Sequence, residues 1–147
     1  MAGMVKFFSP EEEQRIIGAI QAVEKRTTGE IRVHLERKSS GNILDDAVGI
    51  FHRLNMHDTK AHNGVLIVIV PSEKQFAIIG DEGIDDVLPD NFWEEERNLM
   101  VAQFKKGQYC EGVVKAIEKI GDKLQAHFPV TGEEENPNEL PDDISYS

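Results

Sequence analysis

The continuous apolar run GVLIVIV at residues 64–70 constrains the fold of this chain more than any other segment. Its β-branched residues and leucine favour a strand, and because no polar residue interrupts them, both faces of that strand must be buried. Such a strand lies inside a sheet that has helices on each side. The run is far shorter than the roughly 20 apolar residues of a transmembrane helix, so we expect no membrane span.

Two shorter segments are expected to join this central strand in a sheet. Residues 30–36 (EIRVHLE) alternate apolar and polar side chains, which is typical of a strand with one buried face. Residues 75–80 follow the central strand after the turn at residues 71–74, which favours an antiparallel hairpin. The first strand, the helix after it and the central strand should form a parallel, right-handed crossover.

Four helices complete the predicted fold. Ser9 and Glu12 form a capping box at the start of the first, and Asn42 caps the second. Asp90 caps a third that runs to Lys106, and the last ends before Pro129. The fold class is therefore α/β: a small mixed sheet, made of a parallel βαβ unit and an antiparallel hairpin, flanked by helices on both faces as an α/β sandwich. The apolar face of the second helix should consist of Leu44, Ala47, Val48, Phe51 and Leu54.

The domain is expected to span residues 1–129. Residues 130–147 carry six acidic and no basic residues, which predicts a flexible acidic C-terminal tail. The whole chain has 27 acidic and 16 basic residues, and its net charge of −11 argues against a nucleic-acid partner. The single Cys110 and the absence of an apolar leader favour a reducing compartment, so we expect a cytoplasmic monomer.

The densest acidic cluster is DEGIDD at residues 81–86, directly after the third predicted strand. Closely spaced carboxylates suit hard cations such as calcium and magnesium, which prefer oxygen ligands. Because the hairpin is antiparallel and the crossover is parallel, this cluster should lie at the sheet edge where the other two strands begin. Polar residues at those strand starts would then lie near the cluster: Glu30, Asp58, His62 and Asn63.

The sequence therefore predicts a calcium or magnesium site formed by Asp81, Asp85, Asp86, Glu30 and Asp58. The alternative is a solvated helix start, where the helix dipole favours acidic residues. A zinc site at His57 and His62 is disfavoured, because a spacing of five places them on different faces of a helix and no cysteine lies nearby. His34 and His52 are expected at the surface.

Several blocks of the chain resemble the TPM domain family. They are TGEIRV at residues 28–33, NGVL at 63–66, GDEGI at 80–84, FKKG at 104–107 and EGV at 111–113. The resemblance covers residues 7–128. Residues 138–145 (NELPDDIS) also resemble the ending of a soluble bacterial branch of that family.

The resemblance implies an α/β sandwich and a function connected with a cation. The family is named for a thylakoid lumen phosphatase, a photosystem II repair protein and a receptor auxiliary subunit. Some members bind calcium or a similar cation in an acidic crevice and act as acid phosphatases, and this crevice role transfers to Asp81, Asp85 and Asp86. The phosphatase members have a Gly-x-Gly-Leu block where this chain has Gly80-Asp81-Glu82-Gly83-Ile84, a difference that bears on the hydrolytic activity.

Three functions follow from these observations. The first is a cation-binding module whose cation orders residues 81–86 and whose sheet edge then engages a partner. The second is a metal-dependent acid phosphatase acting on phosphomonoesters, in which the cation polarises a phosphoryl oxygen and activates water. The third is a metal-free interaction module that binds a protein partner through the acidic tail or the crevice.

Overall fold

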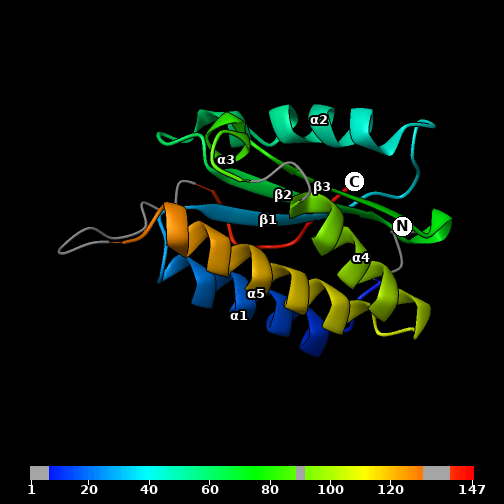
Figure 1. Ribbon diagram of the computed structural model, residues 1–147. Helices are drawn as coiled ribbons and strands as arrows, with labels where there is room; N and C mark the ends of the chain where they lie inside the picture. Colours follow the sequence, from blue (N-terminus) through cyan, green and yellow to red (C-terminus); the bar gives the residue numbers. More distant parts are fainter. Residues whose placement is uncertain (1–6, 89–91, 131–139) are drawn as a thin grey trace.

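The computed structural model describes residues 7–88, 92–130 and 140–147 (Figure 1). Its four-stranded sheet has the strand order β3-β2-β1-β4. Helices α1 and α5 pack together on one face of the sheet, and α2 covers the other face (Figure 1). The elements are α1 Pro10–Glu24, β1 Glu30–Leu35, α2 Ile43–Arg53, η1 Met56–Asp58, β2 Gly64–Val70, η2 Pro71–Glu73, β3 Gln75–Gly80, α3 Glu82–Asp85, α4 Phe92–Lys105, α5 Tyr109–His127 and β4 Ser145–Tyr146.

The mixed sheet predicted from the sequence is confirmed. Strand β1 pairs parallel with β2, and β2 pairs antiparallel with β3. All seven residues of β2 are buried, as its uninterrupted apolar run requires. Its odd-numbered residues belong to the larger core under α1 and α5, whereas Leu66 and Val68 pack in the smaller core under α2. Helices therefore cover both faces of the sheet.

The predicted starts of α1 and α2 are also confirmed. Ser9 Oγ accepts from the backbone N–H of Glu12 at 3.1 Å, and the Glu12 carboxylate accepts from the Ser9 N–H at 2.9 Å. Asn42 Oδ1 accepts from the N–H groups of Leu44 and Asp45. These bonds satisfy donors that have no partner within the first turn of a helix. Asp90, the predicted cap of α4, lies outside the described residues.

The C-terminal end of the chain differs from the flexible tail that its composition predicts. Strand β4 pairs parallel with β1, with Ser145 opposite His34 and Tyr146 opposite Leu35. Leu140 and Ile144 are 5% and 8% exposed and belong to the two cores. The few apolar residues of this acidic segment give no periodic pattern, which is why composition alone pointed to a tail. The rest of this segment, residues 131–139, lies outside the described residues.

The same segment corrects the expectation that β1 has only one buried face. His34, predicted at the surface, is 1% exposed. Its Nδ1 lies 2.8 Å from Ser145 Oγ, and its Nε2 lies 2.7 Å from Ser147 Oγ. Burial lowers the pKa of this imidazole, against the opposing effect of Glu36. The hydroxyl groups of the C-terminal segment therefore cover the polar side of β1. The alternating pattern of β1 by itself could not predict this covering.

The predicted apolar face of α2 is correct only in part. Ala47, Ile50 and Phe51 face the sheet and are buried. Leu44 and Val48 are instead 51% and 50% exposed. Because β3 is the last strand on that side, a helix lying over β2 and β3 leaves its outer flank without a strand beneath it. None of the helices in the described ranges has the length and apolar character needed to cross a membrane.

A cluster of acidic side chains lies where the C-terminal segment meets α1 and β1. Glu24 is 6% exposed and hydrogen-bonds Asp142, and the Glu30 carboxylate accepts from the Leu140 N–H at 2.7 Å. Burial raises the pKa of Glu24 to about 10, and the nearby charges of Asp142 and Glu30 add to the effect. Glu24 therefore holds its proton at neutral pH, where its neutral carboxyl lies beside Asp142 and Glu30.

We predict that Glu24→Gln stabilises the protein relative to wild type, and that this gain grows as the pH rises. An unfolded glutamate loses its proton near pH 4.5, whereas folded Glu24 retains it to about pH 10. Between these values the folded state binds more protons, so the stability contribution of Glu24 falls with pH. The amide mimics the protonated carboxyl, and we expect a gain of at least about 1 kcal/mol at pH 8 that shrinks toward pH 5. Thermal unfolding across this pH range measures it.

The matched control for this prediction is Glu11→Gln, an exposed position on the same helix. This variant should follow the wild-type pH profile. A Glu24→Gln protein that is destabilised at every pH, or whose difference from wild type does not grow with pH, would contradict the account.

Candidate functional site

Three chain segments meet at one edge of the sheet, as the topology predicts. Glu30 at the start of β1 pairs with Gly64 at the start of β2. Asp81, directly after β3, donates its N–H to the Gly64 carbonyl at 3.0 Å. The Glu30 N–H bonds the Asn63 carbonyl at 3.3 Å. The two strand starts and the acidic segment are therefore neighbours along this edge.

The short helix α3 is fixed to the turn before β2. Asp81 Oδ1 accepts from the Glu82 N–H at 2.8 Å, and Asp81 Oδ2 lies 3.3 Å from His62 Nδ1. The Gly83 N–H donates to the His62 carbonyl at 2.9 Å. His62 has a positive φ of 49°, so this turn adopts a backbone conformation that few non-glycine residues take. Asp81 and His62 are thereby held face to face.

A cleft of about 610 Å³ opens beside this pair and runs along the outer edge of β3. Ile78 and Ile79, which point to opposite faces of the sheet, both line it. One wall comes from α2 on one side of the sheet and the other from α4 on the opposite side. The lining residues are Leu44, Val48, Phe51, His52, His57, His62, Ile78, Ile79, Gly80, Asp81, Glu82, Asp85, Trp93 and Arg97.

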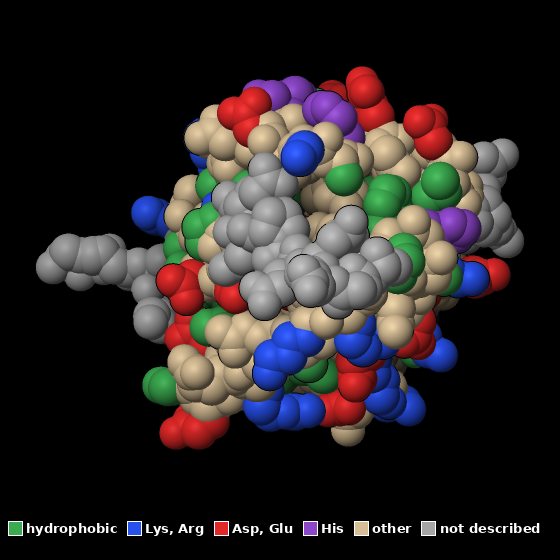
Figure 2. All heavy atoms as spheres, turned by 90° about the vertical axis from the view of Figure 1, so that its left-hand side faces the viewer, with side chains coloured by type: hydrophobic (Ala, Val, Ile, Leu, Met, Phe, Trp, Pro, Cys, Tyr) green, Lys and Arg blue, Asp and Glu red, His purple; other side chains and the backbone are tan. Residues whose placement is uncertain are grey.

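The cleft combines an apolar wall with a polar end. Leu44 and Val48 from α2 and Trp93 from α4 supply apolar lining, whereas Asp81, Glu82 and Asp85 lie at the α3 end. The Asp81 side chain is only 10% exposed, so water screens its charge poorly. Figure 2 shows histidine and acidic side chains beside apolar ones along the upper part of this side of the molecule.

The structure brings together only part of the predicted site. Asp81 and Asp85 line the cleft, but Asp86, in the next position, does not. Glu30 lies at the same sheet edge, but β2 separates it from β3 and its carboxylate bonds Leu140 instead. The Asp58 side chain is 74% exposed, and its Oδ1 lies 3.9 Å from His57 Nε2. Topology placed the chain segments correctly but did not determine the direction of each side chain.

The remaining residues fit a cation only as a small ligand set. Within residues 7–88, 92–130 and 140–147, no three Asp, Glu, His or Cys side chains form a group able to hold a metal. Calcium usually takes six to eight oxygen ligands, whereas magnesium is often held by one or two carboxylates while it keeps several waters. Asp81 and Asp85 are two carboxylates, which is the size of ligand set with which proteins often hold magnesium and too few for a closed protein cage.

The sequence interpretation placed His62 beside the acidic cluster, and the structure does so too, but it missed the grouping of three histidines and the residues from α4. His52, His57 and His62 line one cleft because η1 turns the chain between them, and the rings of His52 and His57 are 4.7 Å apart. Helical spacing separates His57 from His62, but the chain between them is not a continuous helix, so that spacing rule does not apply. Trp93 and Arg97 lie four residues apart on α4, a spacing that places both on one helix face and could have identified them.

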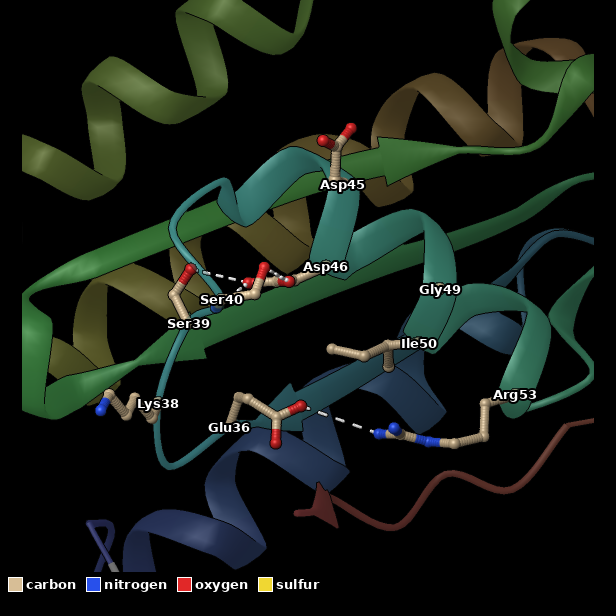
Figure 3. Close-up of a pocket in the computed structure, with 9 residues that line it drawn as sticks. All are labelled: Glu36, Lys38, Ser39, Ser40, Asp45, Asp46, Gly49, Ile50 and Arg53. Atoms are coloured by element: carbon tan, nitrogen blue, oxygen red, sulfur yellow. Dashed lines mark hydrogen bonds and ion pairs between the residues drawn. The ribbon is translucent and has the colours of Figure 1, made fainter.

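A second hollow, of about 700 Å³, lies between α2 and the loop that precedes it (Figure 3). Its polar groups bond one another. Ser39 Oγ donates to Asp46 at 2.6 Å, and Arg53 lies 3.7 Å from Glu36. Hydrogen bonds from Ser39 and Ser40 lower the pKa of Asp46. These contacts serve to fix the loop, so the cleft along β3 is the better candidate for function.

We predict that Gly83→Ala displaces α3 from the turn at His62. A Cβ at this position would lie 2.6 Å from the carbonyl oxygens of Ala61 and His62, which are backbone atoms that cannot swing aside. The expected loss is about 1–3 kcal/mol of unfolding free energy, because overpacking forces a backbone shift. Chemical denaturation measures the loss, and amide NMR shifts should locate it at the α3 end of the cleft.

Gly18→Ala is the control, since a Cβ on this α1 residue meets nothing within 4 Å. Alanine should stabilise α1 by about 0.5–1 kcal/mol. If Gly83→Ala matched this gain, α3 would not be fixed as described.

A sequence model of the TPM domain family matches residues 4–123. A search of curated proteins found no match. The NMR structure of the BA42 protein from the psychrophilic bacterium Bizionia argentinensis is 44% identical, with a TM-score of 0.90 and coverage of 100% of both chains.

Two more distant NMR structures share the fold. The N-terminal domain of a protein from P. gingivalis is 22% identical with a TM-score of 0.68, and covers 85% of this chain and 83% of that domain. The N-terminal domain of the cg2496 protein from Corynebacterium glutamicum is 15% identical with a TM-score of 0.66, and covers 86% and 78% respectively. At these identities the likeness concerns the fold alone.

Proposed function

Because the chain belongs to the TPM domain family, we propose that it is a binding module that takes a divalent cation, calcium or magnesium, at the α3 end of its cleft. The observation that carries this proposal is the shared position of Asp81 and Asp85 on one cleft beside the fixed start of α3. Hard cations prefer such oxygen ligands.

The electrostatics of this end favour a cation. Asp81, Glu82 and Asp85 bring three carboxylates to one end of the cleft, and the low exposure of Asp81 weakens screening of its charge. His62 is the partner of Asp81 Oδ2, and a cation there would replace this contact. Water would complete the coordination, so we expect weak binding.

The cation would serve to order the cleft. Asp81 follows β3 directly and Asp85 ends α3, so one ion held by both would tie the helix to the sheet edge. The apolar wall of Leu44, Val48 and Trp93 would then remain available to a second ligand. This arrangement supports a regulatory binding role. The acid phosphatase alternative stays a prediction from the family resemblance.

We predict that calcium, and then magnesium, titrated into chelator-stripped protein produces saturable amide NMR shifts centred on Asp81 to Asp85. Asp85→Asn should weaken this binding at least about tenfold, because the amide oxygen is a poorer ligand than a carboxylate. Asp86→Asn is the matched control, since Asp86 is an adjacent acid outside the cleft and its loss should leave the affinity unchanged.

Two results would overturn the proposal. No saturable shift at millimolar calcium or magnesium would remove the cation site. Equal weakening by Asp85→Asn and Asp86→Asn would show a diffuse attraction to the acidic segment in place of a site in the cleft.

A further inference from the structure

Within the described residues, β3 is an edge strand, and half of its backbone groups face away from β2. The Asp81 N–H bonds the Gly64 carbonyl, and in an antiparallel ladder such pairs recur at every second residue. Ile79 and Ala77 therefore bond β2, whereas Ile78 and Gly80 point their N–H and C=O groups outward. No backbone bond outside the regular elements of the described chain involves Ile78 or Gly80.

This outward edge forms the floor of the cleft. Ile78, Ile79 and Gly80 line it, with α2 on one side and α4 on the other. Two of the three large apolar side chains exposed in the described residues, Leu44 and Val48, lie on its wall. Exposed apolar groups gathered on a hollow mark an interaction site more often than ones scattered singly.

Charge indicates which partner would fit. Asp81, Glu82 and Asp85 line the α3 end of the cleft, and the chain carries a net charge of −11. A partner with a basic side chain at that end would complement the acids and be attracted over a distance. Apolar side chains on the same partner would cover Leu44 and Val48.

We propose that the cleft binds an extended peptide segment of a partner protein as an additional strand on β3. The segment pairs its backbone with Ile78 and Gly80, places an apolar side chain against Leu44 and Val48, and directs a lysine or arginine toward Asp81 and Asp85. Strand addition of this kind takes affinity from backbone hydrogen bonds and specificity from alternate side chains. The inference goes beyond the cation proposal and needs no bound metal.

The walls of the cleft favour a single peptide over a second copy of the sheet. Leu44 and Val48 on one side and Trp93 and Arg97 on the other flank the edge. A second copy pairing through its own β3 would bring its own two helices alongside these walls. An isolated extended segment has no flanking helices of its own.

The test uses the full chain, labelled with ¹⁵N, in a chelator that removes calcium and magnesium. The probe is a capped six-residue peptide of alternating valine and lysine. We expect saturable amide shifts and slowed amide exchange at Ile78 and Gly80. Val48→Ser should weaken binding roughly tenfold, since it removes apolar contact area. Val87→Ser, at an exposed position outside this cleft, is the matched control and should bind as wild type does.

Two further peptides separate strand addition from other contacts. A peptide with glutamate in place of lysine should not bind, because the acidic end repels it. A peptide with an N-methylated backbone should not bind either, because it cannot donate hydrogen bonds to the β3 edge. The inference is overturned by absent shifts at Ile78 and Gly80, by equal binding of the N-methylated peptide, or by self-association of the chain through β3. Because no metal is present, such failures leave the cation titration unaffected.

Discussion

The burial of β2 on both faces is the constraint on which the rest of the structure depends. Its seven apolar residues need a layer on each side, which α1 and α5 supply on one face and α2 on the other. Its two ladders then fix where the neighbouring strands begin and end. The placement of Asp81 beside Gly64 follows from this register, so the candidate site is a consequence of how the core is built.

Much of the fold could be predicted because local signals agree with the tertiary structure. The apolar run of β2, the capping residues Ser9 and Asn42, and the short turn before β3 each point to the element observed. The C-terminal strand could not be predicted from local sequence. Leu140 and Ile144 are buried only because the segment that carries them packs beside β1 in the folded protein. Strands that pair across more than a hundred residues of sequence produce no hydrophobic pattern within a short sequence window.

The site could be predicted only to the level of topology. Strand directions place Glu30 and Asp81 at one edge, but tertiary contacts turn Glu30 toward Leu140 and leave Asp81 and Asp85 in the cleft. The α2 flank shows the same limit, because helical periodicity cannot show that the sheet ends at β3 and exposes Leu44 and Val48. The cleft is thus a product of where the sheet stops, which depends on every strand at once.

The cleft depends on an open β3 edge beside an acidic end. Amide hydrogen exchange of the free protein tests it most directly, since the register assigns inward and outward N–H groups residue by residue. We predict alternating exchange rates, slow at Ala77 and Ile79 and fast at Ile78 and Gly80. Uniform protection along β3 would contradict it, because the edge would then be covered and the cleft closed to any ligand.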